Sequence, residues 1–194
     1  MTKAKFSNNS PFVLYEVDLK SLKLGFGNGS ELDVSQLLSN GRANYIIFEH
    51  LISTFSGIEA NSQGGKSDLR NAAGYNYEVK SYQDVVAHPL PKADLFHTAS
   101  SSTFSANNHG PAVKKLLDAG KYPEALQLCM EKGYDKNDFY VYINSAQYQI
   151  SIALSYVIIP KRDVLRLLSK SDPRLISRRD VLNLVTKKVV IRGI

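Results

Sequence analysis

The fold is decided by a stretch in the first half of the chain that reads KSDLRNAAGYNYEVKSY, residues 66–82. Two runs with alternating residues flank three small residues, which is typical of two strands joined by a short loop. Gly74 stands where such a loop requires the left-handed region of backbone space. We therefore predict a β-hairpin with strands at 66–71 and 75–82.

The pairing of this hairpin decides which side chains share a face. If it turns at residue 73, Asn71 faces Tyr75 and Asp68 faces Glu78. Directly opposed residues point to the same side of a sheet, and so does Lys80, two residues beyond Glu78. The sequence thus predicts two carboxylates and an ammonium on one face of the hairpin.

This cluster has a chemical meaning. Val79 should point the other way, into the core, and so hold the strand in register. Opposed carboxylates repel one another unless a cation compensates them. Their hard oxygen atoms suit Mg²⁺, which takes one or two carboxylates and keeps several waters. Lys80 beside such an ion could hold or deprotonate a water that attacks phosphorus.

A glutamate precedes the hairpin on a predicted helix at 42–55. Phe48, Leu51, Ile52 and Phe55 form one apolar stripe on this helix, with the spacing of a buried face. Glu49 lies at the edge of the stripe, where its carboxylate can approach a buried sheet without entering the core.

Taken together, these residues resemble the PD-(D/E)XK nuclease superfamily, and within it the type II restriction endonucleases. Nine residues separate Asp68 from Glu78-Val79-Lys80, and Glu49 lies on the helix before them. The resemblance covers about residues 45–83. Ser67 stands where members of the family often have proline.

The resemblance implies a role for each residue of the motif. Asp68 and Glu78 would hold Mg²⁺, for which Mn²⁺ can substitute, and the carbonyl of Val79 would add a ligand. Lys80 would orient the nucleophilic water, and Glu49 would be an outer or second-metal ligand. The implied activity is Mg²⁺-dependent hydrolysis of double-stranded DNA, with catalytic residues Asp68, Glu78, Lys80 and Glu49.

Other interpretations stay open at this point. Asp68 and Lys80 could form a cross-strand surface salt bridge, and Glu49 could be a solvated helix residue. Within the same chemistry, the chain could be a nicking subunit or a repair or junction nuclease. In a different class, it could be a nucleic-acid-binding protein without catalysis.

Charge is concentrated at the C-terminal end. The chain carries a net charge of +6, and residues 160–194 hold ten basic and three acidic side chains. A basic flank is the electrostatic pattern of a polyanion-binding protein. Lys161, Arg162 and Arg166 should face outward from a helix and contact phosphates.

Further candidates for DNA contact have side chains that can read base edges or reach phosphates. Arg174, Arg178 and Arg179 lie in the basic segment. Asn107, Asn108 and His109 lie in a polar loop that could line a DNA cleft, and Gln83 follows the hairpin.

The remaining pattern predicts one domain over residues 1–194, of α/β or α+β class, with a central mixed sheet flanked by helices. The resemblance implies that this is a nuclease domain with a restriction-endonuclease-like fold. We expect further strands at 12–20, 139–144, 150–159 and 188–192, and further helices at 34–40, 111–119, 123–132, 161–169 and 178–186.

Several classes are excluded by composition. Cys129 is the only cysteine and falls on the apolar face of a helix, so a disulfide framework and a Cys-rich metal site are both absent. The glycine-rich stretches lack a nucleotide-binding pattern, and no stretch has the length of a membrane span. We expect a cytoplasmic protein that acts as a homodimer, with one active site for each strand of DNA.

Overall fold

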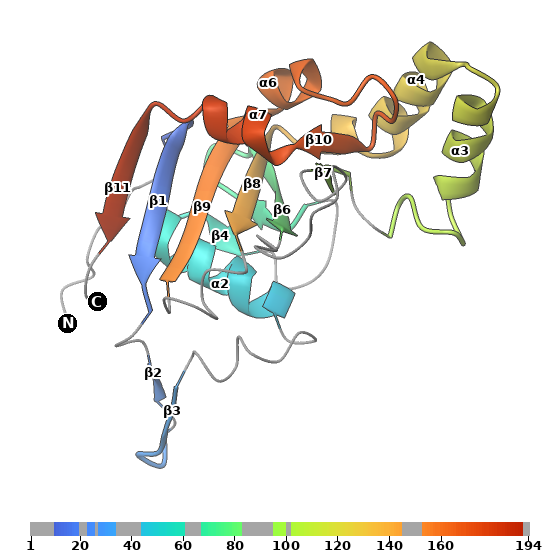
Figure 1. The fold of residues 1–194 in the computed structure, drawn as a ribbon. Helices are drawn as coiled ribbons and strands as arrows, with labels where there is room; N and C mark the ends of the chain where they lie inside the picture. Colours follow the sequence, from blue (N-terminus) through green and yellow to red (C-terminus); the bar gives the residue numbers. More distant parts are fainter. Residues whose placement is uncertain are drawn as a thin grey trace, which may run out of the picture.

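The computed structural model describes residues 10–19, 23–25, 27–33, 44–60, 67–82, 95–99, 102–144 and 153–191. Its centre is a mixed sheet, which curls across the molecule in Figure 1. From edge to edge the strands are β11 (Lys187–Ile191), β1 (Val13–Asp18), β9 (Ala153–Pro160), β8 (Phe139–Asn144), β6 (Asn76–Tyr82), β5 (Leu69–Arg70) and β4 (Glu59–Ala60). β1 and β11 are parallel, as are β6 and β8, and the other neighbours are antiparallel.

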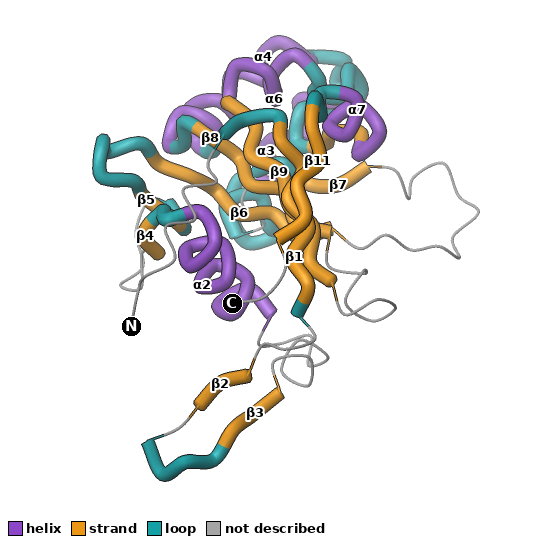
Figure 2. The backbone as a smooth tube through the Cα atoms, turned by 90° about the vertical axis from the view of Figure 1, so that its left-hand side faces the viewer, coloured by secondary structure: helices purple, strands orange, loops and turns teal. Residues whose placement is uncertain are grey.

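Helices cover both faces of this sheet. They are α2 (Asn44–Ser56), α3 (Gly110–Asp118), α4 (Tyr122–Lys132), α6 (Lys161–Arg166) and α7 (Arg178–Asn183), with a 3₁₀ turn η2 at Tyr134–Lys136. Two small antiparallel pairs complete the description: β7 (Leu95–His97) with β10 (Leu175–Ser177), and β2 (Lys23–Gly25) with β3 (Glu31–Asp33). In Figures 1 and 2, the β2–β3 pair extends away from the end of the sheet near α2.

The sheet separates two hydrophobic cores. In the first core, Phe48, Ile52 and Phe55 of α2 pack with Val141 and Ile143 of β8. Side chains that alternate along a strand point to opposite faces, so Tyr140 and Tyr142 enter the second core. Each fully buried Phe, Ile or Val side chain contributes about 1.5–3 kcal/mol to stability.

The second core is closed by the remaining helices and the β7–β10 pair. Its helical members are Val113 of α3, Ala125 and Cys129 of α4, Val164 of α6 and Val181 of α7. These helices lie on the side of the sheet away from α2 (Figures 1 and 2).

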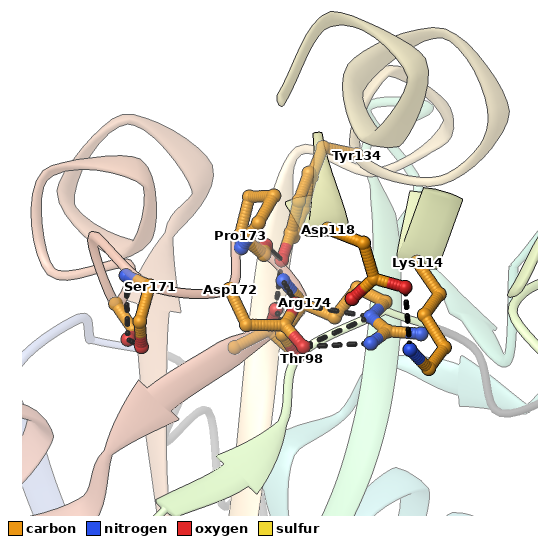
Figure 3. A network of polar contacts seen from close by, with 9 residues as sticks. Thr98, Lys114, Asp118, Tyr134, Ser171, Asp172, Pro173 and Arg174 are labelled. Carbon is orange, nitrogen blue, oxygen red and sulfur yellow. Dashed lines mark hydrogen bonds and ion pairs between the residues drawn. The ribbon is translucent and has the colours of Figure 1, made fainter. Parts of the chain in front are cut away.

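A polar network ties β10 to β7 beneath α4 (Figure 3). The hydroxyl of Tyr134 donates to the carbonyl of Pro173 at 2.6 Å and also bonds to Thr98 Oγ1. Arg174 forms a two-pronged pair with Asp172, with an Nη2–Oδ2 distance of 2.7 Å, and its carbonyl accepts from the Thr98 N–H at 3.0 Å. The network fixes the chain reversal between α6 and β10.

Most expected elements are confirmed. The strand at 12–20, the helices at 42–55, 111–119 and 123–132, and the strands at 139–144 and 188–192 appear within about two residues of their predicted ends. The strand expected at 150–159 is described from residue 153 onward, and the helix expected at 34–40 lies outside the described residues.

Two basic helices are shorter than predicted. α6 ends at Arg166 because the chain then turns so that Leu168 bridges to Ile176. α7 ends at Asn183, where the N–H groups of Leu184 and Val185 close a tight turn onto the carbonyls of Val181 and Leu182. Strands β4, β7 and β10 were not predicted as strands, because two or three residues are too few to show alternation.

Candidate functional site

The predicted hairpin forms with the expected register. Leu69 pairs with Tyr77 and Arg70 pairs with Asn76, and Gly74 takes a φ of +87° in the loop. The first strand is shorter than the expected 66–71, since only Leu69 and Arg70 form a ladder.

Asp68 explains why β5 begins only at Leu69. Its Oδ2 accepts the backbone N–H of Val79 at 2.7 Å, while its own N–H donates to the carbonyl of Tyr77 at 3.1 Å. The Asp68 side chain thus accepts the N–H of β6 that a backbone carbonyl would otherwise accept, and the β5–β6 ladder does not extend to Asp68. The contact holds the Asp68 carboxylate against β6, between the positions of Glu78 and Lys80.

Glu78 and Lys80 form a largely buried ion pair on β6. The distance from Lys80 Nζ to Glu78 Oε1 is 2.5 Å, and the side chains of Lys80 and Glu78 are only 15% and 10% exposed, respectively. The interpretation of a surface salt bridge between Asp68 and Lys80 is therefore wrong: Lys80 pairs with Glu78, and neither partner lies on the open surface.

Asn137 holds the other oxygen of Glu78. Its Nδ2 donates to Glu78 Oε2 at 3.3 Å, and the whole residue is 4% exposed. Asn137 follows η2, and its backbone N–H donates to the carbonyl of Tyr134 at 3.2 Å. Sequence reasoning missed this residue because its approach to β6 depends on β6–β8 pairing, which no local pattern reveals.

Two tyrosines stand beside the ion pair. In the β6–β8 register, Glu78 faces Tyr140 and Lys80 faces Tyr142. Both hydroxyls are buried, and they have no hydrogen-bond partner among the described residues, as is also true of Asn137 Oδ1. Burial raises the pKa of Tyr142 well above its usual value, and the charges of Tyr140, Tyr134 and Glu78 raise it further.

Glu49 joins the cluster from the other layer. The first core fixes α2, and Glu49 is half-buried next to the fully buried Phe48. Burial raises the pKa of Glu49 to about 7, with further contributions from the charges of Asp68 and Glu78, against which Lys80 acts. Glu49 is thus only partly solvated, which favours a place in the cluster over the interpretation as a solvated helix residue.

The same crowding affects Asp68. Burial raises its pKa to about 6, the charge of Glu78 adds to the rise, and the Val79 N–H and Lys80 oppose it. Three carboxylates thus lie within electrostatic reach of one ammonium group. Such an excess of buried negative charge is relieved by protonation or by a cation.

The donors fit a hard divalent ion. Asp68, Glu78 and Glu49 offer carboxylate oxygens, and Val79 offers its carbonyl. Within the described ranges, no group of three or more His, Cys, Asp or Glu side chains is placed so that it could hold a metal ion together.

The basic segment begins close to this site. The Lys161 N–H, at the start of α6, donates to the carbonyl of Asp138 at 2.8 Å. The same Asp138 accepts the Asn76 N–H through Oδ2 at 2.8 Å, and it is the neighbour of Asn137. A short series of hydrogen bonds therefore links α6 to the β6 strand that carries Glu78 and Lys80.

The candidate DNA contacts differ in their availability. On α6, Arg162 and Arg166 are 77% and 76% exposed, whereas Lys161 is 28% exposed and lies 3.6 Å from Asp135. Arg174 is 18% exposed and paired with Asp172. At the start of α7, Arg178 is half-buried and Arg179 is exposed.

The loop candidates lie away from α6. Asn107 and Asn108 are exposed and His109 is half-buried, in the turns that lead into α3. The Asn108 side chain donates to the carbonyl of Ser102 at 3.3 Å. Gln83 lies outside the described residues.

Cys129 is confirmed as a core residue. It is fully buried in α4, and burial raises its pKa to about 12, to which the charge of Asp172 contributes. The thiol therefore stays protonated at neutral pH and does not act as a nucleophile.

Comparisons with known proteins yield no relative. No family model matches the sequence, and neither a curated protein nor a solved structure gives a significant match. In the part of the chain that the structure describes, every helix is too short or too polar to cross a membrane.

Proposed function

We propose that this chain is a Mg²⁺-dependent endodeoxyribonuclease of the PD-(D/E)XK, restriction-endonuclease-like type, which cleaves double-stranded DNA at specific sites. One observation carries the proposal: a buried lysine, Lys80, pairs with Glu78 at the open end of the β5–β6 hairpin, where Asp68 is tied to β6 and Glu49 lies within electrostatic reach. A purely structural ion pair would need one carboxylate, and additional carboxylates here cost stability.

Each residue has a chemical role in this proposal. Asp68 and Glu78 would hold Mg²⁺, the Val79 carbonyl would add a ligand, and Glu49 would be an outer or second-metal ligand. The bound ion would supply charge stabilisation to the phosphate and its leaving oxygen. Lys80 donates through Nζ to the attacking water and orients it in line with the scissile bond.

The Asp68–Val79 hydrogen bond supports this assignment. It fixes a carboxylate that would otherwise rotate freely at the end of a two-residue strand. Asp68 uses one oxygen, Oδ2, to accept from Val79, so its other oxygen is the one that would contact a cation. Groups that are held in place before the substrate binds need little reorganisation during the reaction.

Substrate binding is assigned to the basic segment. Arg162 and Arg166 project from α6, which starts within two hydrogen bonds of β6. Their exposed guanidinium groups suit phosphate oxygens. Two copies of the chain, each cutting one strand, would cleave a symmetric site, and this reaction would take place in the cytoplasm.

The test is cleavage of supercoiled plasmid by the whole chain, with Mg²⁺, with Mn²⁺ or with EDTA. Lys80→Ala should abolish cleavage, whereas Lys114→Ala, at a 68% exposed lysine paired with Asp118, should leave it unchanged. A thermal melt of each variant separates lost chemistry from lost folding.

The products distinguish the competing functions. Discrete fragments that require the metal support a site-specific enzyme. Nicked circles indicate a nicking subunit or a repair nuclease. Intact plasmid, with DNA binding that ignores both EDTA and Lys80→Ala, would overturn the catalytic proposal.

A further inference from the structure

We infer that Asn137 is a positioning residue that orients Glu78 for the metal ion. This inference rests on the proposed function and extends it to a residue outside the recognised motif. It is carried by the hydrogen bond from Asn137 Nδ2 to Glu78 Oε2, at 3.3 Å, on a carboxylate whose other oxygen contacts Lys80.

These two partners leave Glu78 little freedom. Its side chain is 10% exposed, and Lys80 and Asn137 occupy one oxygen each. A carboxylate held at both oxygens keeps a single orientation, whereas one held at a single oxygen can rotate about its terminal torsion. Asn137 therefore decides which way the Glu78 carboxylate faces when Lys80 turns toward a water.

Asn137 is itself held by the backbone. Its N–H donates to Tyr134, and the next residue, Asp138, exchanges hydrogen bonds with Asn76 at the start of β6. The amide is thus tied to the same strand that carries Glu78. Groups that orient metal ligands typically change metal affinity by about 10–100-fold when they are removed.

The surroundings argue against a role for Asn137 in stability alone. Its Oδ1 is buried without a hydrogen-bond partner among the described residues, as are the hydroxyls of Tyr140 and Tyr142. An unsatisfied buried polar atom carries a desolvation penalty. An apolar residue would avoid that penalty, so the amide is explained by what its Nδ2 group does: it donates to Glu78, and it also lies close to the Tyr140 hydroxyl.

The test is binding of Mn²⁺ alone to the whole chain, followed by electron paramagnetic resonance, which counts the free ion. Asn137→Ala should weaken Mn²⁺ binding about 10-fold or more. Asn137→Ser, which is small and keeps a donor, should weaken it less. Asn137→Asp keeps the shape but replaces the donor with a second carboxylate beside Glu78, and it should weaken binding at least as much as alanine does.

The control is Thr98→Val. Thr98 is fully buried, and valine removes its hydroxyl bonds to Tyr134 and Arg174 without touching Glu78. This variant should destabilise the protein and leave Mn²⁺ affinity unchanged. Serine and aspartate at residue 137 keep the test usable if Asn137→Ala does not fold.

The outcomes separate this inference from the proposed function. Wild-type binding that is lost in Asp68→Asn and weakened in the Asn137 variants supports both. Equal affinity in wild type and Asn137→Ala, with binding lost in Asp68→Asn, overturns the role of Asn137 alone. Absence of Mn²⁺ binding to the wild type overturns the proposed metal site and, with it, this inference.

Discussion

Directly before β5 begins, the Asp68 side chain accepts the backbone N–H of Val79 through one oxygen, at 2.7 Å. The bond ties a carboxylate to the strand that carries Glu78 and Lys80. The Asp68 carboxylate thus has two separable properties: it accepts a hydrogen bond, which asparagine can also do, and it carries a charge, which asparagine does not.

We expect Asp68→Asn and Asp68→Ala to differ in stability and agree in activity. Asparagine still accepts the Val79 N–H through its carbonyl oxygen, while alanine leaves it unpaired at a cost of about 1 kcal/mol or more. Both variants lack the metal-binding charge and should not cleave DNA. Urea denaturation and plasmid cleavage, measured side by side, check this. Equal stability of the two variants would contradict a stabilising role for the hydrogen bond between the residue at 68 and the Val79 N–H.

Glu49→Gln should stabilise the protein at neutral pH. The pKa of Glu49 is raised from 4.5 to about 7 in the folded chain, so its ionised form is disfavoured there. A raised pKa means that stability is present below the unfolded value and is lost as the pH rises through 7. Since Glu49 is only half-buried, we expect a gain of the order of 1 kcal/mol at pH 8.

Thermal melts of Glu49→Gln from pH 4 to pH 8 measure this effect. The difference in melting temperature between Glu49→Gln and wild type should be near zero at pH 4 and should reach its full size by pH 8. Glu59→Gln, at an exposed glutamate on β4, is the matched control. A variant less stable than wild type at pH 8 would show that Glu49 is a structural residue.

Asp172→Asn should destabilise the protein most at neutral pH. Burial acts to raise the pKa of Asp172, but the hydrogen bonds and charge of Arg174 outweigh it and hold that pKa below its usual value. A lowered pKa gives stability above the unfolded value that is lost as the pH falls through the folded one. We expect a loss of about 2 kcal/mol at pH 7, from a pair that is largely buried.

Urea denaturation at pH 7 and at pH 3 checks the Asp172 prediction. The difference in the free energy of unfolding between wild type and variant should be smaller at pH 3. Metal binding should not change, because Asp172 belongs to the network around β7 and β10 (Figure 3). A gap independent of pH would mean that the ionised pair contributes no stability.

Removal of Arg162 and Arg166 together should weaken DNA binding uniformly across sequences. Each phosphate contact releases counterions, so the slope of log affinity against log salt should become shallower by about 0.9 for each phosphate that is no longer neutralised. Fluorescence anisotropy with two unrelated duplexes, at several salt concentrations, measures the slope. Lys23→Ala, at an exposed lysine on β2, is the control, and an unchanged slope would place the DNA on another face.

The hairpin and its register could be predicted because they depend on local chemistry. Gly74 marks the turn, and alternation places Glu78 and Lys80 on one side. Glu49 could be placed near them because the apolar stripe of α2 fixes which edge of the helix meets the sheet.

Partners that come from distant parts of the chain could not be predicted. Asn137 reaches Glu78 only because β8 pairs with β6 in parallel, a pairing that spans a gap of some sixty residues. The choice of Glu78 as the ion-pair partner of Lys80 also depends on three-dimensional detail, since alternation places both Asp68 and Glu78 on its face of the hairpin. The lengths of β5 and α6 were overestimated because a side-chain acceptor and a bridge at Leu168 end them early.

The two hydrophobic cores on opposite faces of the sheet have a consequence for folding. Glu49 is carried by a helix of one core, while Asn137 and the two tyrosines belong to the side of the other. No single segment of the chain therefore forms the cluster alone. The cluster assembles only after both helical layers have packed onto the central strands. Detachment of either layer would disperse the carboxylates, so the proposed metal site should exist only in the complete native state.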